Sequence, residues 1–305
     1  MSGTVPLTRR RWVRLVLGVM IAGNLLGAGG AMYLLGDATE LTVDEAIRRF
    51  RDANADAVAA PTPTSLASTT KPQPSAKATA TGAKRKATTP ASASSKSGAV
   101  AMGDLETGVY VYATDGYEET DALSGQRHDY PSQTTITASK HDCGYRFRWQ
   151  PLEERWDQSD TCRNSKGIVL VRFAIYHEFF QRNATEDFVL EDGSVVLPAY
   201  PVVGDSWRWK GASNDSAIDT RVSVVEYETV DVGGRAVKTI HLRYETAMSG
   251  ANDGTQIQDR WHSLDNGLLI RLINRVDAKV EVPFGGTANY TERYRIDLKS
   301  LSPEG

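Results

Sequence analysis

The feature that most constrains this chain is one uncharged apolar run at residues 15–35, LVLGVMIAGNLLGAGGAMYLL. As a helix rising 1.5 Å per residue, the run covers about the 30 Å of a bilayer's hydrocarbon core. Four arginines stand before it in residues 1–14, and cytoplasmic flanks of membrane helices carry an excess of Lys and Arg. The pattern predicts a cytoplasmic basic segment, one transmembrane signal-anchor helix at the cell membrane, and a C-terminal domain outside the cytoplasm.

A cleaved secretory signal peptide is the main alternative. Gly29, Gly30 and Ala31 are small residues that fit a cleavage site. Apolar residues continue through 32–35, past that site, which favours retention of the helix. Residues 8–14 also resemble the twin-arginine export signal of bacteria. Cleavage of the N-terminal segment stays open at this point.

Charge divides along the sequence. Residues 1–102 hold 13 of the 35 basic side chains and 6 of the 38 acidic ones, so residues 103–305 hold 22 and 32. The outer domain is therefore acidic, and its charge argues against nucleic acid, whose phosphates need a positive footprint. Its length is enough for one substantial core.

Two segments connect the span to this domain. Residues 41–54 show helical spacing of apolar side chains, with Thr42 and Glu45 as a capping box. We expect a short amphipathic helix, either solvated or resting its Ile47 and Phe50 on the membrane or on a second copy. Residues 55–102 are rich in Ala, Thr, Ser, Pro and Lys and predict a disordered linker. Its lysines either attract anionic wall polymer or lipid or only keep the linker soluble.

The domain at 103–305 reads as mainly β. Short runs rich in Val, Ile, Thr, Tyr and Trp alternate with turn residues about every ten positions, which is typical of antiparallel sheets. The last five strands form a meander, and their length predicts a strongly curved, half-barrel-like sheet. Expected strands are residues 108–114, 133–139, 145–150, 155–161, 168–179, 194–197, 206–210, 217–230, 236–247, 255–263, 268–281 and 288–301.

The two cysteines predict a disulfide. If the flanking strands pair around a turn at residues 152–153, residues whose numbers sum to 305 face each other, as do Cys143 and Cys162. Thiols placed like this oxidise outside the cytoplasm. The same rule places Trp149 opposite Trp156. Free thiols, or a two-ligand metal site with the neighbouring residues 141–142, are the alternatives.

Sequence patterns for catalysis are missing. The five histidines show no zinc-ligand spacing, and there is neither a GxSxG motif nor a phosphate-binding glycine loop. The sequence predicts no catalytic residues, no cofactor, no metal and no enzymatic activity.

Two stretches carry a family resemblance. Residues 201–209, PVVGDSWRW, and residues 261–271, with Trp261 and the turn Asp265 to Gly267, resemble patterns of uncharacterised bacterial envelope proteins. Residues 42–51, TVDEAIRRFR, are similar to stretches beside the anchor of actinobacterial membrane proteins. The resemblance implies a fold related to the half-barrel carriers of lipids and lipoproteins, whose concave face can hold an acyl chain. It implies no catalytic residues.

Three functions follow as hypotheses. The first is a non-enzymatic binding or structural protein of the cell envelope, and the second is a binder of lipid or another hydrophobic ligand on the concave sheet face. A cell-wall hydrolase is the third, without a carboxylate pair that stands out. Aromatic side chains at strand spacing either line such a face or simply pack a core. The candidate lining residues are Trp207, Trp209, Trp261, Phe173 and Phe179.

Overall fold

The computed structural model describes residues 39–59, 103–122, 125–179, 182–281 and 286–305. The predicted membrane span at 15–35 and nearly all of the predicted linker lie outside these residues. Within the described residues, no helix combines the length and apolarity that crossing a membrane requires.

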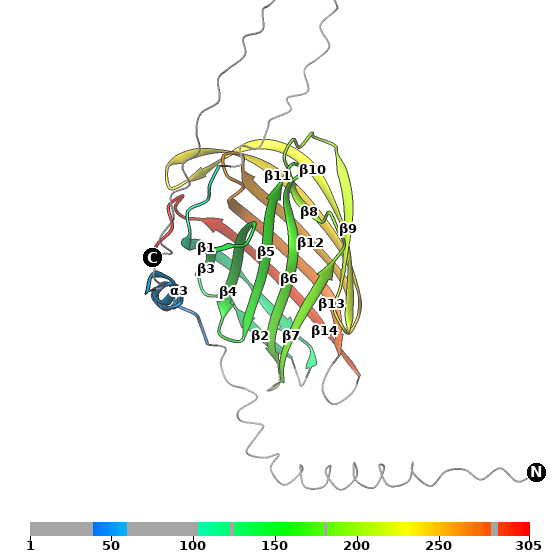
Figure 1. Cartoon of the computed structure of the whole chain (residues 1–305). Helices are drawn as coiled ribbons and strands as arrows, with labels where there is room; N and C mark the ends of the chain where they lie inside the picture. Colours follow the sequence, from blue (N-terminus) through cyan, green and yellow to red (C-terminus); the bar gives the residue numbers. More distant parts are fainter. Residues whose placement is uncertain (1–38, 60–102, 123–124, 180–181, 282–285) are drawn as a thin grey trace, which may run out of the picture.

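One helix, α3 (Val43–Ala59), stands in the described part of the chain, five residues longer than predicted at its C-terminal end. The hydroxyl of Thr42 accepts a hydrogen bond from the Glu45 amide at 3.3 Å and caps the first turn. Its apolar face, with Ile47 and Phe50, packs on Val109 of the first strand, so it covers the outside of the sheet instead of lying free in solvent. Figure 1 shows the helix beside the C-terminus.

Fourteen strands follow in the described residues. Their bounds are β1 (Gly108–Thr120), β2 (Gln126–Asp129), β3 (Gln133–His141), β4 (Gly144–Leu152), β5 (Arg155–Asn164), β6 (Gly167–Phe179), β7 (Arg182–Leu190), β8 (Val195–Pro198), β9 (Ser206–Ala212), β10 (Ser216–Val232), β11 (Arg235–Gly250), β12 (Asn252–Ser263), β13 (Leu269–Glu281) and β14 (Thr287–Leu298). All paired strands are antiparallel, and every predicted strand is present.

The sheet closes into a barrel. Twelve strands form the ring in the described part, in the order β1, β3, β4, β5, β6, β7, β9, β10, β11, β12, β13, β14 and back to β1 (Figure 1). The prediction of an open, half-barrel-like sheet is therefore wrong, because the sheet is closed. β1 runs six residues beyond its predicted end at 114, and its register from Tyr112 opposite Leu298 to Thr120 opposite Tyr290 joins it to β14. Closure removes the free edges that an open sheet would expose.

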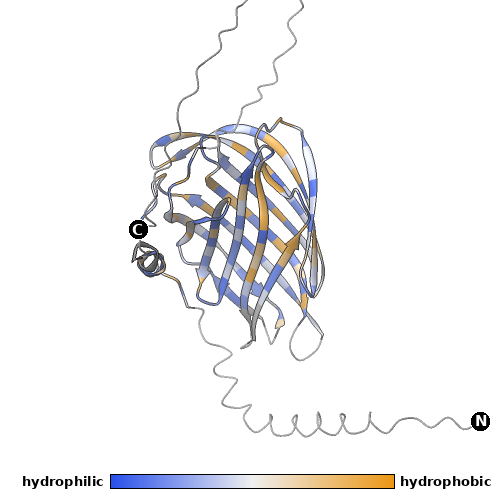
Figure 2. Cartoon of the chain, in the orientation of Figure 1, coloured by the Kyte–Doolittle hydropathy of each residue, from blue (hydrophilic) through white to orange (hydrophobic). Residues whose placement is uncertain are grey.

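The C-terminal meander is confirmed. β10 to β14 pair in sequence order, and Gly233, Gly234 and Gly267 supply the positive φ of 57°, 82° and 77° that their turns need. The sequence analysis missed β2 and β7. Apolar and polar residues alternate along the wall strands, as Figure 2 shows, because successive side chains point to opposite faces of a sheet.

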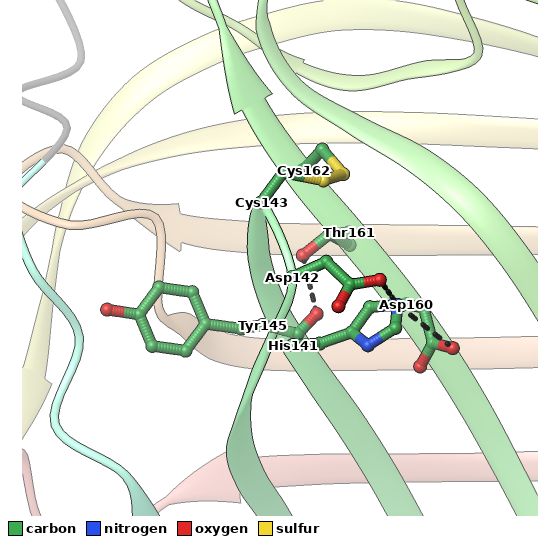
Figure 3. Close-up of a disulfide and its surroundings, with 7 residues drawn as sticks. All are labelled: His141, Asp142, Cys143, Tyr145, Asp160, Thr161 and Cys162. Carbon is green, nitrogen blue, oxygen red and sulfur yellow. Dashed lines mark hydrogen bonds and ion pairs between the residues drawn. A yellow bond between two sulfur atoms is a disulfide. The ribbon is translucent and has the colours of Figure 1, made fainter. Parts of the chain in front are cut away.

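The disulfide between Cys143 and Cys162 is present, but its hairpin is shifted by one residue (Figure 3). Cys162 pairs with Gly144, and Trp149 pairs with Asp157, so the predicted facing of Trp149 and Trp156 is wrong. The turn lies one residue later than expected, and a bulge follows Trp149. Because side chains alternate between the two faces of a sheet, a shift of one residue in the strand pairing changes which side chains share a face.

The two tryptophans therefore lie on opposite faces. Trp149 is buried against the ring of Tyr130, with centroids 5.5 Å apart, whereas Trp156 stacks on Tyr176 of β6. Beside the disulfide, His141 lies 3.7 Å from the carboxylate of Asp160.

Candidate ligand-binding cavity

The barrel encloses a cavity of about 930 Å³. This volume is near the upper end of the range of about 300–1,000 Å³ that is typical of small-molecule sites. One wall of the cavity is apolar and is built by β6, β7, β8, β9 and β10. Its residues belong to one packed cluster that includes Phe173, Phe188, Leu197, Trp209 and Ile218. The rings of Phe173 and Phe188 stack at 5.7 Å.

Only some of the predicted lining residues lie on the cavity wall. Phe173 and Trp209 line the cavity, while Trp207 and Trp261 do not. Trp207 lies on the same face of β9 as Trp209 and packs against the same cluster, but its indole NH donates to the carbonyl of Val195 of β8 at 2.7 Å. The side chain of Phe179 lies outside the described residues.

The opposite wall carries a buried polar network that the sequence analysis did not find. Glu118 of β1 and Glu292 of β14 face each other directly across the strand pair that closes the barrel. Both are almost fully buried, with exposed fractions of 4% and 2%. Two like charges in this position would repel. The network therefore needs a cation.

Arg155 of β5 supplies that cation from across the interior. Its Nη2 donates to Glu292 at 3.0 Å, and its Nε lies 3.8 Å from Glu118. The hydroxyl of Tyr130 lies 2.6 Å from Glu292 and 3.3 Å from Glu118, and Asn274 donates to Glu292 at 2.7 Å. The network joins β1, β5, β13 and β14, so it locks the closure of the barrel.

The pKa values of Glu118 and Glu292 are shifted in opposite directions. Burial alone would raise the pKa of Glu118, but the hydrogen bond with His128, the charge that His177 acquires in acid and the charge of Arg155 outweigh burial and lower this pKa to about 2. Burial lowers the pKa of His177 to about 4. Because His177 is therefore neutral at pH 7, Arg155 is the charge that keeps Glu118 ionised. Burial raises the pKa of Glu292 despite Arg155.

Arg260 of β12 is a second cation on the cavity wall. Its guanidinium donates from Nε to Gln258 at 3.1 Å and lies 4.5 Å from the ring centroid of Tyr244. Within the part of the chain that the structure describes, it forms no ion pair with a carboxylate. On the same face of β12, the next titratable side chain after Arg260 is His262, whose pKa burial lowers to about 4. Arg260 is thus a charge that an anionic ligand can neutralise.

The wall is weakest where β7 meets β9. These strands share only the pairs Val189 with Ala212 and Leu190 with Gly211. Further along, Glu186 of β7 accepts hydrogen bonds from Ser216 at 2.8 Å and from Asn252 at 2.9 Å. This carboxylate ties β7 to β10 and β12 at the cavity rim.

Among the described residues, one cluster of side chains could hold a metal ion: Glu226, Glu228 and His241. None of the three lines the cavity. They lie on the opposite face of β10 and β11.

Comparison with known proteins gives weak similarity only. No protein-family model matches the sequence, and no curated protein matches it. The hypothetical lipoprotein YmcC from Escherichia coli K12 is 9% identical, with 64% of this chain and 91% of that chain covered at a TM-score of 0.27. A candidate lipoprotein from Parabacteroides distasonis ATCC 8503 is 11% identical, with 66% and 98% covered at a TM-score of 0.29. Similarity at this level assigns neither a family nor a function.

Proposed function

We propose that this chain is a non-enzymatic, membrane-anchored binding protein outside the cytoplasm whose barrel takes up an anionic amphiphile of the fatty-acid class. The observation that carries the proposal is Arg260, a cation without a carboxylate partner in the described residues, on the wall of a largely apolar cavity.

The cavity has a place for each part of such a ligand. An acyl chain lies against Phe173, Phe188 and Trp209, where each buried methylene contributes about 0.8 kcal/mol. The carboxylate accepts hydrogen bonds from Arg260, and the Tyr244 ring keeps the guanidinium in place. Arg155 does not compete, because Glu292 and Glu118 already surround it.

The experiment measures quenching of tryptophan fluorescence by a bromine-labelled fatty acid in the full chain, reconstituted in nanodiscs of a zwitterionic lipid. Bromine quenches at short range, so the proposal predicts that Trp209→Phe clearly reduces the ligand-specific quenching, with Trp149 as the other tryptophan on the cavity wall. Trp156→Phe is the control, because Trp156 stacks on Tyr176 and does not line the cavity, and this variant should leave the quenching intact. Equal quenching in the two variants would overturn the proposal.

The same assay distinguishes the contribution of the ligand's carboxylate from that of its acyl chain. A charge-assisted hydrogen bond is worth about 1.5–3 kcal/mol, so Arg260→Gln should weaken binding roughly 10- to 100-fold. Removing two methylenes from the fatty acid should weaken it about 15-fold. If the affinity depends on chain length but not on Arg260, the ligand is a neutral lipid and the proposed anionic head is wrong.

The location is a separate proposal that rests on the sequence at 1–35. A reporter enzyme that is active only outside the cytoplasm, fused after Gly305, should be active in living cells. Activity of a cytoplasmic reporter at the same position would contradict the proposed topology.

A further inference from the structure

A β-bulge on β10 brings three metal-binding side chains to one point on the outer face of the barrel. The register shifts between Val224 and Glu226, and after the shift Glu226 pairs with His241 of β11. Glu228 follows two positions later and therefore points to the same side. Ligand atoms of Glu226, Glu228 and His241 all lie within 4.8 Å of one another. Bulges of this kind often redirect side chains at functional sites.

The ring of His241 is buried and held in a fixed orientation. It is 7% exposed, and its Nε2 lies 2.8 Å from the carboxylate of Asp259. Arg243 also donates to Asp259, at 2.9 Å, which keeps that carboxylate ionised and accepting. Nε2 therefore donates to Asp259, and Nδ1 is the ring nitrogen that remains for a further partner. A carboxylate behind the ring of a metal-binding histidine is the usual second layer of zinc sites.

The Nδ1 atom is buried and, within the described residues, has no hydrogen-bond partner. It points toward the carboxylate of Glu226, with 3.9 Å between Nδ1 and Oε1. Trp261 stacks on the imidazole at 4.2 Å and 11°, which fixes the plane of the ring, and its indole NH donates to Glu228. One buried imidazole nitrogen and two carboxylates therefore converge on one point, and a shared cation, either a metal ion or a proton on Nδ1, neutralises them there.

We propose that Glu226, Glu228 and His241 bind a divalent transition-metal ion of the zinc class, with Asp259 as the outer partner of the histidine. One imidazole nitrogen and two carboxylate oxygens suit Zn²⁺, whereas Ca²⁺ and Mg²⁺ require more oxygen ligands. Tetrahedral bonds of about 2.1 Å place ligand atoms about 3.4 Å apart. Rotation of Glu226, whose side chain is 61% exposed, closes the remaining gap. A fourth position stays open to water.

This site is independent of the proposed ligand-binding function, because its residues face away from the cavity. The test uses the full chain without a histidine tag, treated with a chelator and desalted, and titrated with ZnCl₂ in a calorimeter. The proposal predicts one zinc bound per chain with micromolar or tighter affinity. It also predicts visible absorption typical of tetrahedral cobalt when Co²⁺ is added in place of zinc.

Variants assign the ligands. Glu226→Gln removes one ligand at an exposed position, and it should weaken zinc binding at least tenfold. His241→Gln should abolish the cobalt spectrum. Glu245→Gln, an exposed acid on the same strand β11, is the matched control and should bind like the unaltered chain. The proposal is overturned if no stoichiometric binding is seen, or if Glu226→Gln and His241→Gln bind zinc as tightly as the control.

Discussion

His262 should make the barrel unstable in mild acid. The ring lines the cavity and its Nδ1 donates to the carbonyl of Gly267 at 3.0 Å. Burial lowers its pKa from 6.5 to about 4; the hydrogen bond to Gly267 opposes this shift, and the charge of Arg260 adds to it. Because the folded-state pKa is the lower one, the unfolded chain takes up the proton first as the pH falls. Stability is therefore lost from about pH 6.5 down to pH 4 and is fully present above that window.

The magnitude follows from linkage. A group that is protonated only in the unfolded state changes the unfolding free energy by about 1.4 kcal/mol per pH unit, which amounts to about 2 kcal/mol between pH 7 and pH 5. His177, with its pKa also at about 4, contributes a similar amount. These are upper values, because both rings are partly exposed and solvent screens their charges. The chain should lose up to about 4 kcal/mol over this interval.

Urea unfolding of the chain and of His262→Asn, followed by tryptophan fluorescence at pH 8, 7, 6 and 5, measures the effect. The asparagine amide can still donate to Gly267 but does not titrate. The difference at pH 8 gives the structural cost of the substitution. Between pH 7 and pH 5 the variant should lose about half as much stability as the unaltered chain. Equal losses in both proteins would refute this assignment.

Three further substitutions test the architecture by the same unfolding assay. Gly116→Ala should lower the free energy of unfolding by about 1–3 kcal/mol, because its new methyl group overlaps Tyr294 on β14, the strand that closes the barrel. An unchanged stability would show that β1 and β14 do not pack this closely. Arg155→Leu should cost about 3–5 kcal/mol, because it leaves buried carboxylates without their cation, and a neutral effect would argue against the network. Cys143→Ser should cost about 3 kcal/mol through loss of a crosslink that spans 19 residues, and a loss below 1 kcal/mol would contradict that estimate.

Local patterns predicted the strands and turns well. The Gly233–Gly234 pair and the turn before Leu268 identified hairpins that the structure contains, because their backbone conformations favour glycine. β7 was missed because its first residues, Arg-Asn-Ala-Thr-Glu-Asp, show no apolar alternation. The barrel closure joins residues 170 or more positions apart, such as Thr120 and Tyr290, and no short-range pattern encodes such a pairing.

The site was harder to predict than the fold. Trp207 and Trp209 look alike in sequence and share one face of β9, and only Trp209 lines the cavity, whereas Trp207 bonds to β8. Arg155 and Glu292 looked like ordinary strand polar residues. A usable signal was the alternation of Tyr290, Glu292 and Tyr294, in which a charged residue shares the inward face of aromatic neighbours. The bulge that aligns Glu226 with His241 left no such signal.

A crystal structure of the full chain with a bound saturated fatty acid tests the central claim most directly. The account predicts a carboxylate within hydrogen-bond distance of Arg260 and an acyl chain in contact with Phe173, Phe188 and Trp209. A fatty acid bound only on the outside of the barrel, or one inside whose carboxylate lies away from Arg260, would contradict it.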